Sequence, residues 1–477
     1  MVDPYIIETH SIRENTKPEI ETQWVYKEFK NLAINCGRLI NRFIQTMVTL
    51  SNKPGESIAA ASKDKAEAKA IYRLLQNEKI TEEVILSSHR NQTIRDIKEC
   101  GEGIILSIQD TSDISYTNLK STTGLGEYGG EERSKGLKVH STIAVTPDGI
   151  MKGLLDQKIW ARDPSERGKR KTKNQRPIEE KESYKWLEAM DRSNKDIPSE
   201  IKVINVCDRE ADLFEFFYKA IKENKFFLVR ATHNRITQDE DKLFDKVHAE
   251  KVAGELTIEI PRDTRRKLPK REATLELKFT KVVMPVPKRK YKAIDKDDLI
   301  EVILILVKEK NQPQGLDPIE WYLLTNVETL SFDDALEKVR WYIQRWKIER
   351  FHYILKSGCK IEELQEEDAA QLKKLILMYS IIASRILCIT HLARENPELS
   401  CETIFEEEEW KILYRIANKT TSYPLKAPTI KEAVSYIAKL GGFLGRKGDG
   451  DPGVKVIWRG LKELNVVLQH YKYLNPK

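Results

Sequence analysis

The sequence predicts an α/β protein in which helices flank a mixed β-sheet and further helical segments occupy both chain ends. Short apolar runs separated by turn residues fill the middle of the 477-residue chain, whereas apolar residues recur at spacings of three and four near both ends. Hydrophobic residues make up 40% of the chain and charged residues 32%, which supplies apolar cores together with a charged exterior. The length exceeds one ordinary domain, so we expect roughly two to four domains.

The N-terminal region predicts a small helical domain. Apolar and basic residues are arranged as on one amphipathic helix over residues 22–50, and a second helix is expected over residues 59–75, after a Pro-Gly break. A basic amphipathic helix suits contact with DNA. An ordinary helical bundle with surface lysines explains the same pattern equally well.

The middle of the chain predicts the main sheet. Three strands joined by hairpin-like links come first, and a strand, a helix and another strand follow. The expected strands cover residues 104–108, 139–145, 151–160, 203–207 and 226–229. This order is that of a ribonuclease H-like domain, a mixed sheet flanked by helices. A further β-rich stretch, residues 235–318, predicts an insertion.

The C-terminal region again predicts helices. Its most apolar stretch, residues 375–393, is interrupted by Arg385 and is interpreted as a buried helix rather than a membrane span. The N-terminus lacks a basic start followed by an apolar core, so we expect no secretory signal. The six cysteines form no Cys-x-x-Cys pair, which fits a reducing cytoplasm.

Positive charge is concentrated in part of the chain. Lysine and arginine number 81 against 74 aspartate and glutamate, a net charge of +7. Three stretches are strongly basic: residues 167–176, 265–271 and 288–292. Most charge runs are solvated loops, so this distribution permits a polyanionic partner without demonstrating one.

The most informative element is a helix expected over residues 336–356. Tyr342, Arg345, Glu349 and Lys356 fall within about 60° of one another on a helical wheel. Apolar side chains lie on the opposite side, where they would face a core: Ile348, Phe351, Ile354 and Leu355. The helix would therefore present a carboxylate beside a phenol, a guanidinium and an ammonium. Surface ion pairing at i, i+4 explains part of this pattern but not the aromatic residue.

Two further carboxylates follow apolar strand sequences. Asp110 and Asp208 stand where each run ends, and nearby Asp113 and Asp212 are interpreted as turn or cap residues. Together with Glu349, the first two offer hard oxygen ligands suited to Mg²⁺ or Mn²⁺. Two such ions about 3.5 to 4 Å apart can activate a water or a 3′-hydroxyl and stabilise the leaving oxygen of a phosphodiester.

Two motifs in this set resemble a known family. Asp208-Arg-Glu-Ala-Asp212 and the spaced pattern Tyr342-x2-Arg345-x3-Glu349-x6-Lys356 are similar to those of bacterial cut-and-paste transposases with an Asp-Asp-Glu active site. More narrowly they resemble insertion-sequence family four, which includes the enzyme used for DNA tagmentation. Further matches in the same order are Ile108-Gln-Asp-Thr-Ser112, Val139-His-Ser141, Glu180-Lys-Glu-Ser183 with Lys185-Trp186, Trp321-Tyr-Leu-Leu-Thr325 and Lys439-Leu-Gly-Gly442. The N-terminal region matches only around Ala70-Ile-Tyr-Arg73, which leaves the recognised end sequence open.

The resemblance implies roles for individual residues. Three would bind divalent metals: Asp110, Asp208 and Glu349. Four would hold phosphates of the transposon end: Tyr342, Arg345, Lys356 and Arg230. Trp321 would stack on a flipped base near the cut, with core packing as the alternative. His140 is interpreted as structural at least as readily as functional.

The predicted function is that of a metal-dependent DNA transposase. It would bind terminal inverted repeats, cut the 3′-ends by hydrolysis, free the other strand through a hairpin intermediate and join the 3′-hydroxyls to target DNA, as a homodimer in the synaptic complex. We expect Mg²⁺ as cofactor, with Mn²⁺ able to substitute. No nucleotide cofactor is expected, because phosphodiester exchange conserves bond energy and no Gly-x4-Gly-Lys phosphate loop is present. A cytoplasmic, nucleoid-associated bacterial protein without a membrane partner is implied.

These inferences divide the chain into a helical DNA-binding domain, residues 1–90, a ribonuclease H-like catalytic domain, residues 91–365, and a helical dimerisation domain, residues 366–477. Two other functions fit the same residues. One is a ribonuclease H-like nuclease or resolvase without strand transfer, and the other is a catalytically silent DNA-binding regulator derived from a transposase.

Overall fold

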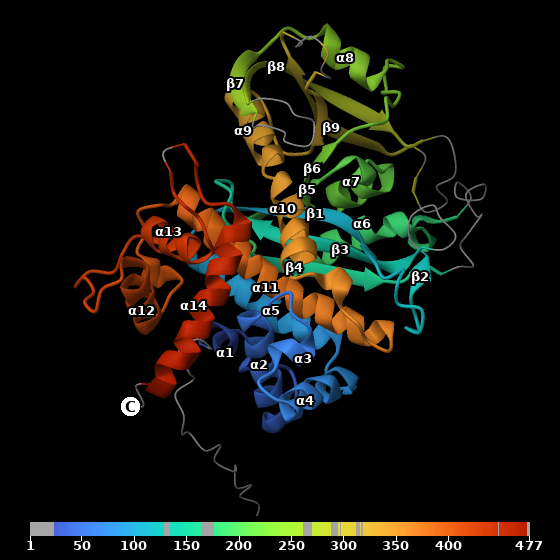
Figure 1. The fold of residues 1–477 in the computed structure, drawn as a ribbon. Helices are drawn as coiled ribbons and strands as arrows, with labels where there is room; N and C mark the ends of the chain where they lie inside the picture. Colours follow the sequence, from blue (N-terminus) through green and yellow to red (C-terminus); the bar gives the residue numbers. More distant parts are fainter. Residues whose placement is uncertain are drawn as a thin grey trace, which may run out of the picture.

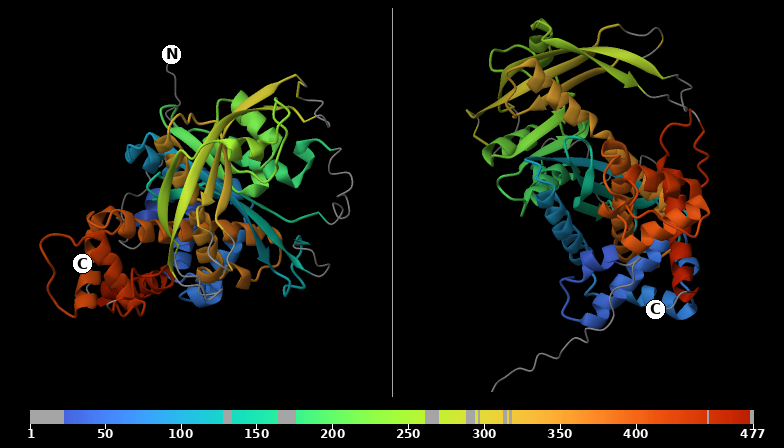
Figure 2. Two further views of the ribbon diagram at one scale, coloured as in Figure 1. Left: turned by 90° about the horizontal axis from the view of Figure 1, so that it is seen from above. Right: turned by 90° about the vertical axis from the view of Figure 1, so that its left-hand side faces the viewer.

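The computed structural model describes residues 23–474 with internal gaps. The gaps are residues 128–133, 164–175, 261–269, 288–293, 296, 312–314, 316–317 and 447. Most of the three basic stretches therefore lies outside the described residues. Figure 1 shows a central sheet, with N-terminal helices below it, C-terminal helices to one side and a β-rich extension above it. Figure 2 shows the extension and the N-terminal helices at opposite ends of the molecule.

The described strands form one sheet of ten, in the order β2-β3-β1-β5-β6-β10-β9-β8-β7, with β4 on the other side of β3. Their bounds are β1 Ile104–Ser115, β2 Gly126–Glu127, β3 Lys135–Val145, β4 Met151–Trp160, β5 Lys202–Cys207, β6 Phe226–Arg230, β7 Gly254–Ile260, β8 Arg271–Pro285, β9 Leu299–Glu309 and β10 Glu320–Thr325. Strands β1, β3 and β4 pair in antiparallel fashion, and β5 and β6 continue from β1 as parallel neighbours. Helices α6 (Lys185–Asn194) and α7 (Phe214–Lys222) lie between them along the chain. The predicted ribonuclease H-like order is confirmed.

The β-rich insertion extends this sheet. Strands β7, β8 and β9 form an antiparallel meander, and β10 joins β9 to β6, again antiparallel. Helix α8 (Leu243–Ala249) packs on β8 and β9. The inward side chains of β9, such as Leu304 and Leu306, share a buried cluster with Phe216 and Phe227 of the central region. The insertion therefore has no separate core.

The N-terminal region is helical, but its segments are shorter than predicted. The helices are α1 Gln23–Phe29, α2 Gly37–Asn52, α3 Ile58–Ala61, α4 Lys65–Gln76 and α5 Glu82–Glu99. The single helix expected over residues 22–50 is wrong. Between α1 and α2 the side chain of Leu32 is buried in the core. The backbone is extended at Cys36, with φ −161°, directly before α2 begins, so the helix is interrupted. Helix α4 starts separately because Asp64 caps it, accepting a hydrogen bond from the Glu67 backbone at 2.8 Å.

The C-terminal region is built on the long helix α11 (Ala369–Glu395), which packs against β4, α2, α4 and α5. It is long and apolar enough to cross a membrane, but 89% of its most apolar window is buried, as in a core helix. The predicted interpretation as a buried helix is confirmed. Helices α12 (Glu407–Asn418), α13 (Ile430–Leu440) and α14 (Val454–Leu474) follow. At the α13–α14 contact a Cβ on Gly460 would lie 1.7 Å from the Ile437 carbonyl oxygen, so only glycine allows this approach.

Candidate active site

Three charged residues stand at one level across neighbouring parallel strands. The register pairs Ile108 of β1 with Val206 of β5, and Cys207 of β5 with Val229 of β6. Continuing both pairings brings Asp110, Asp208 and Arg230 into one row. Parallel strands thus place Asp110, which is about a hundred residues earlier in the sequence, beside the other two.

The backbone holds the two aspartates in different ways. Asp208 directly follows β5, as predicted, and its Oδ1 accepts a hydrogen bond from the Glu210 backbone at 2.8 Å, which caps the short 3₁₀ helix η6 (Arg209–Ala211). Asp110 does not end its strand, since β1 continues to Ser115. The prediction stopped the strand too early because polar residues follow Asp110. Its Oδ1 accepts from the Thr111 backbone at 2.7 Å.

The charges of the two aspartates are poorly compensated. Burial, and next the charge of Asp208, raise the pKa of Asp110 to about 7, against which Arg345 acts only weakly. Burial also raises the pKa of Asp208, and neighbouring Glu210 adds to the effect. Two crowded carboxylates in a partly dehydrated site form an environment that a positive ion would stabilise.

The expected helix over residues 336–356 consists of three pieces. Helix α9 (Phe332–Ile343) begins at a capping box of Ser331 and Asp334, and α10 (Trp346–Tyr353) leads into a π-helical turn, Ile354–Gly358. Between α9 and α10 the backbone N–H groups bond three residues back, as Arg345 does to Tyr342 at 3.0 Å. The prediction of one regular helix is wrong, because residue spacing does not reveal a change in hydrogen-bond type.

The key side chains stay together across this break. One Arg345 guanidinium nitrogen lies 2.9 Å from Glu349 Oε1, and another lies 3.9 Å from Asp110 Oδ2. Tyr342 is 5% exposed; burial raises the pKa of its hydroxyl, while the charges of Arg345 and Arg230 oppose that rise. Arg345 therefore links the helical glutamate to Asp110 of the sheet. The apolar residues predicted to lie opposite, from Ile348 to Leu355, are buried as expected.

Lys356 lies apart from this group. The π-helical turn carries it toward the end of β1, where its Nζ donates to the Asp113 carbonyl oxygen at 2.5 Å and lies 3.9 Å from Glu362. The predicted common face is supported by contacts for Tyr342, Arg345 and Glu349, whereas the contacts of Lys356 are with the end of β1 and Glu362. Extra backbone in a π turn rotates every later side chain relative to an α-helix.

Trp321 and Arg230 border the site on β10 and β6. The half-buried Trp321 indole packs edge-on against Tyr342, with ring centroids 5.5 Å apart, and the Arg230 guanidinium donates to the Glu320 carbonyl at 3.1 Å. Both residues thus lie beside Tyr342. The base-stacking and phosphate-binding roles stay predictions.

Asp113 and Asp212, which were interpreted from the sequence as turn or cap residues, contact more distant parts of the chain. Asp212 is not a helix cap, because α7 is preceded by Leu213 and no side chain caps it. Its buried carboxylate instead accepts hydrogen bonds from residues 232–235. Asp113 pairs with Lys138 at 2.5 Å. His140 is 1% exposed, packs edge-on against Trp186 and contacts the Thr111 hydroxyl at 2.9 Å, so its environment is structural.

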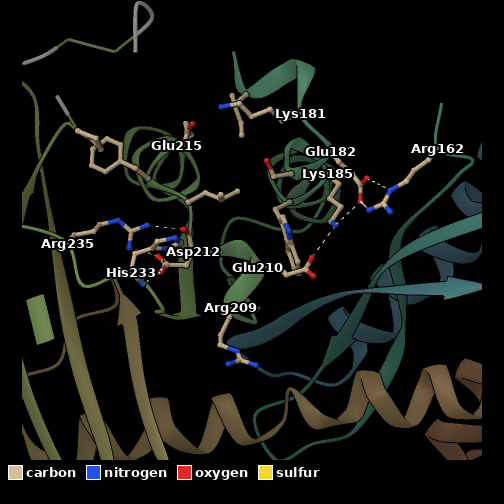
Figure 3. A pocket seen from close by; sticks show the side chains of 16 residues that line it. Arg162, Lys181, Glu182, Lys185, Arg209, Glu210, Asp212, Glu215, His233 and Arg235 are labelled. Carbon is tan, nitrogen blue, oxygen red and sulfur yellow. Dashed lines mark hydrogen bonds and ion pairs between the residues drawn. The ribbon is translucent and has the colours of Figure 1, made fainter. Parts of the chain in front are cut away.

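A cavity of about 770 Å³ opens beside the loop that carries Asp208. Figure 3 shows two ion-pair groups on its walls: Asp212 with His233 and Arg235, and Arg162, Glu182, Lys185 and Glu210. Lys185 is only 6% exposed and lies 3.4 Å from Glu210. The walls come from the start of α6, η6, the start of α7 and the segment after β6.

The donor set fits a divalent metal only in part. Within the described residues, no three histidine, cysteine, aspartate or glutamate side chains gather closely enough to hold one ion. The reason is visible at Glu349, whose carboxylate pairs with Arg345 rather than turning to Asp110. Asp110 and Asp208 supply carboxylate oxygens of the kind Mg²⁺ prefers, and their crowded charges favour a cation.

Comparison with known families identifies the chain. A family model described as transposase DNA-binding matches residues 21–80, and one described as the Tn5 transposase dimerisation domain matches residues 381–476. The two matches support a Tn5-like transposase. In this transposase the first match covers α1–α4, and the second covers much of α11 together with α12–α14. The family resemblance predicted from the motifs is confirmed.

A solved structure also aligns with this transposase. Its title is that of a piggyBac transposase synaptic complex with hairpin DNA, and the alignment covers 96% of this chain and 80% of that chain at 9% identity and a TM-score of 0.35. The family assignment rests on the two family models rather than on this distant alignment. The candidate active site lies between the two matched regions.

Proposed function

We propose that this transposase cuts transposon ends by metal-dependent hydrolysis and joins the resulting 3′-hydroxyls to target DNA. One observation carries the proposal: β1 and β5 bring Asp110 and Asp208 to one level, and Arg345 links Glu349 to Asp110. Two sheet carboxylates with a helical glutamate linked to one of them through Arg345 suit phosphodiester chemistry with divalent metals.

The carboxylates of Asp110, Asp208 and Glu349 would hold Mg²⁺, with Mn²⁺ able to substitute. Bound ions would supply Lewis acidity and favour ionisation of an attacking water or 3′-hydroxyl. For Glu349 to serve as a ligand, its carboxylate must leave Arg345, which then becomes available to a DNA phosphate. The same guanidinium would thus change partners when DNA arrives.

Other side chains would position the DNA. Arg345, Arg230 and the Tyr342 hydroxyl lie together and can donate hydrogen bonds to phosphate oxygens of the transposon end. Lys356 would contact a phosphate further along, near the end of β1. Trp321, already packed on Tyr342, could stack on a flipped base and so stabilise the tightly bent strand of a hairpin intermediate.

The terminal regions would supply recognition and assembly. Residues 21–80 would bind the terminal inverted repeats, and residues 381–476 would pair two copies in the synaptic complex. Two copies are required because two transposon ends are joined to one target. A DNA-binding transposase of this kind is consistent with a cytoplasmic location.

The test uses purified protein, a DNA fragment bearing the ends that flank the coding region, a supercoiled target plasmid and Mg²⁺. Joined products are expected with Mg²⁺ or Mn²⁺ and are expected to be absent with Ca²⁺ or with Glu349→Gln. The matched control is Glu363→Gln, which removes an exposed glutamate that lies 3.1 Å from nearby Lys360. It should join ends as the unaltered protein does.

Other outcomes would replace the proposal. Metal-dependent cutting that depends on Glu349 but yields no joined product would indicate a nuclease or resolvase. End binding without cutting in Mg²⁺ or Mn²⁺ would indicate a catalytically silent DNA-binding regulator.

A further inference from the structure

Asp212 has more hydrogen-bond partners than its position in a short loop requires. Its carboxylate is fully buried and accepts from five groups: the Thr232 backbone at 2.7 Å, the Thr232 hydroxyl at 3.2 Å, the His233 backbone at 2.8 Å, the His233 Nδ1 at 2.9 Å and the Arg235 guanidinium. Arg235 also donates to the Asp212 carbonyl oxygen at 2.9 Å. Figure 3 shows this group on one wall of the cavity.

These bonds join two segments that each leave the site. Asp208 is held by the Glu210 backbone within η6, and the Asp212 backbone N–H closes η6 through Arg209 at 3.3 Å. On the other side, Thr232 is two residues after Arg230 in the chain. Asp212 thus stands between the loop that carries a candidate metal ligand and the loop that follows a candidate phosphate contact.

We infer that Asp212 is a positioning residue that fixes Asp208 and Arg230 relative to each other. The inference rests on the proposed function, because that function gives both residues their roles. Neighbouring parallel strands set the level of the two residues, but the β5–β6 ladder ends at the Cys207–Val229 pair, one residue before each of them. Arg230 stays paired with Leu323 of β10, whereas Asp208 lies beyond the end of β5. Beyond this point, the hydrogen bonds from the Thr232 and His233 backbones to the Asp212 carboxylate connect the two segments in place of β5–β6 hydrogen bonds.

The contact between Asp212 and the segment after β6 is itself held in place by neighbouring elements. The Arg235 guanidinium lies over the buried Phe217 ring of α7, 5.5 Å from its centroid, so α7 holds the cation that binds Asp212. The Ala231 backbone donates to the Tyr322 carbonyl of β10 at 2.7 Å, which ties the same segment to the next strand. Both sides of the contact are therefore attached to rigid elements.

The first test measures amide hydrogen exchange in the metal-free protein. Asp212→Asn keeps the size of the side chain but removes its charge. We expect faster exchange at Thr232 and His233, whose amides Asp212 holds, and also at Glu210, whose amide is held by Asp208. Faster exchange at Thr232 and His233 alone would show a purely local role and would overturn the inference.

The second test measures how end cleavage depends on Mg²⁺ concentration. Residues that orient metal ligands typically change metal affinity by about 10-fold to 100-fold when altered. For Asp212→Asn we expect the half-saturating Mg²⁺ concentration to rise about 10-fold. A variant that is less stable but has an unchanged Mg²⁺ requirement would contradict the positioning role.

The matched control is Asp368→Asn. Asp368 caps α11, accepting from the Gln371 backbone at 2.9 Å, and contacts neither loop of the site. It removes a carboxylate charge as Asp212→Asn does, and because asparagine can still cap the helix it should alter neither exchange at Glu210 nor the Mg²⁺ requirement. If Asp212→Asn does not fold, Arg235→Gln weakens the same contact from its other side and should show the same two effects.

Failure of the inference differs from failure of the proposed function. If the unaltered protein does not cut its ends, the proposed function is wrong, and the exchange experiment still decides whether Asp212 couples the two loops. If cutting is normal and exchange at Glu210 does not change, only the positioning role is wrong.

Discussion

Asp208 and Asp212 belong to one loop, yet their environments are opposite. Asp208 accepts one backbone hydrogen bond, and burial raises the pKa of its carboxyl. Burial would also raise the pKa of Asp212, but the charge of Arg235 and hydrogen bonds from Thr232 and His233 outweigh it and hold that pKa below its ordinary value. An uncompensated carboxylate is available to a ligand, whereas a fully compensated one maintains structure.

Replacing Asp208 gives the largest expected effect. Asp208→Asn should lower end cleavage by about 1000-fold or more, equivalent to about 4 kcal/mol of transition-state stabilisation. The melting temperature in EDTA should stay the same or rise, because the variant removes a charge that burial and nearby Asp110 disfavour. Cleavage assays and thermal unfolding check both parts. A large fall in melting temperature would place Asp208 with the structural carboxylates.

Replacing Asp212 should mainly lower stability, whereas replacing Asp208 should mainly lower cleavage. Asp212→Ala leaves Arg235 and two backbone N–H groups without their acceptor, and breaking such a buried pair costs about 3 to 5 kcal/mol of unfolding free energy. Denaturant unfolding at neutral pH measures this cost. Because the folded-state pKa of Asp212 is lowered, its contribution is complete above the unfolded-state pKa and is lost as pH falls through the folded-state pKa. A difference from the unaltered protein that grows on acidification would contradict the assignment.

The contrast also shows what sequence could reveal. Glu349 and Arg345 are four residues apart, so helical spacing placed them together correctly. Asp110 and Asp208 were found because each follows an apolar run in the sequence. The partners of Asp212 lie 20 to 23 residues later in the chain, and no local pattern marks such a contact. Its position at the start of an expected helix favoured a cap role that the structure contradicts.

The fold was predictable where hydrophobic pattern decides it and not where backbone irregularity does. The strands of the central sheet and the buried character of α11 followed from apolar runs. The breaks before Gly37 and at Arg345 did not, because apolar residues keep their spacing on both sides of each break. The displacement of Lys356 by the π-helical turn has the same cause. The chemistry of the site thus depended on residue type, and its geometry on the irregular turns.

A third buried carboxylate, that of Asp156, tests the comparison through the pH dependence of stability. Asp156 is 3% exposed, and burial raises its pKa to about 6 although Arg192 lies 3.7 Å away. The folded state therefore holds a proton that the unfolded state has already lost, so ionisation above pH 6 reduces stability. Relative to Asp156→Asn, the unaltered protein should gain about 2 kcal/mol between pH 7.5 and pH 4.5. Denaturant unfolding of both proteins across this range measures the gain. A difference that does not change with pH would mean that Arg192 already compensates Asp156.

The smallest expected effect belongs to a carboxylate whose role is local. Asp368 caps α11 by accepting from the backbone and the side chain of Gln371, both at 2.9 Å. Asp368→Ala should cost about 1 kcal/mol, as is typical for loss of a helix cap. It should leave the Mg²⁺ requirement unchanged, because it touches neither Asp208 nor Arg230. A cost that approaches that of Asp212→Ala would show that the number of donors around a carboxylate does not determine its structural weight, and the contrast between Asp208 and Asp212 would then need another explanation.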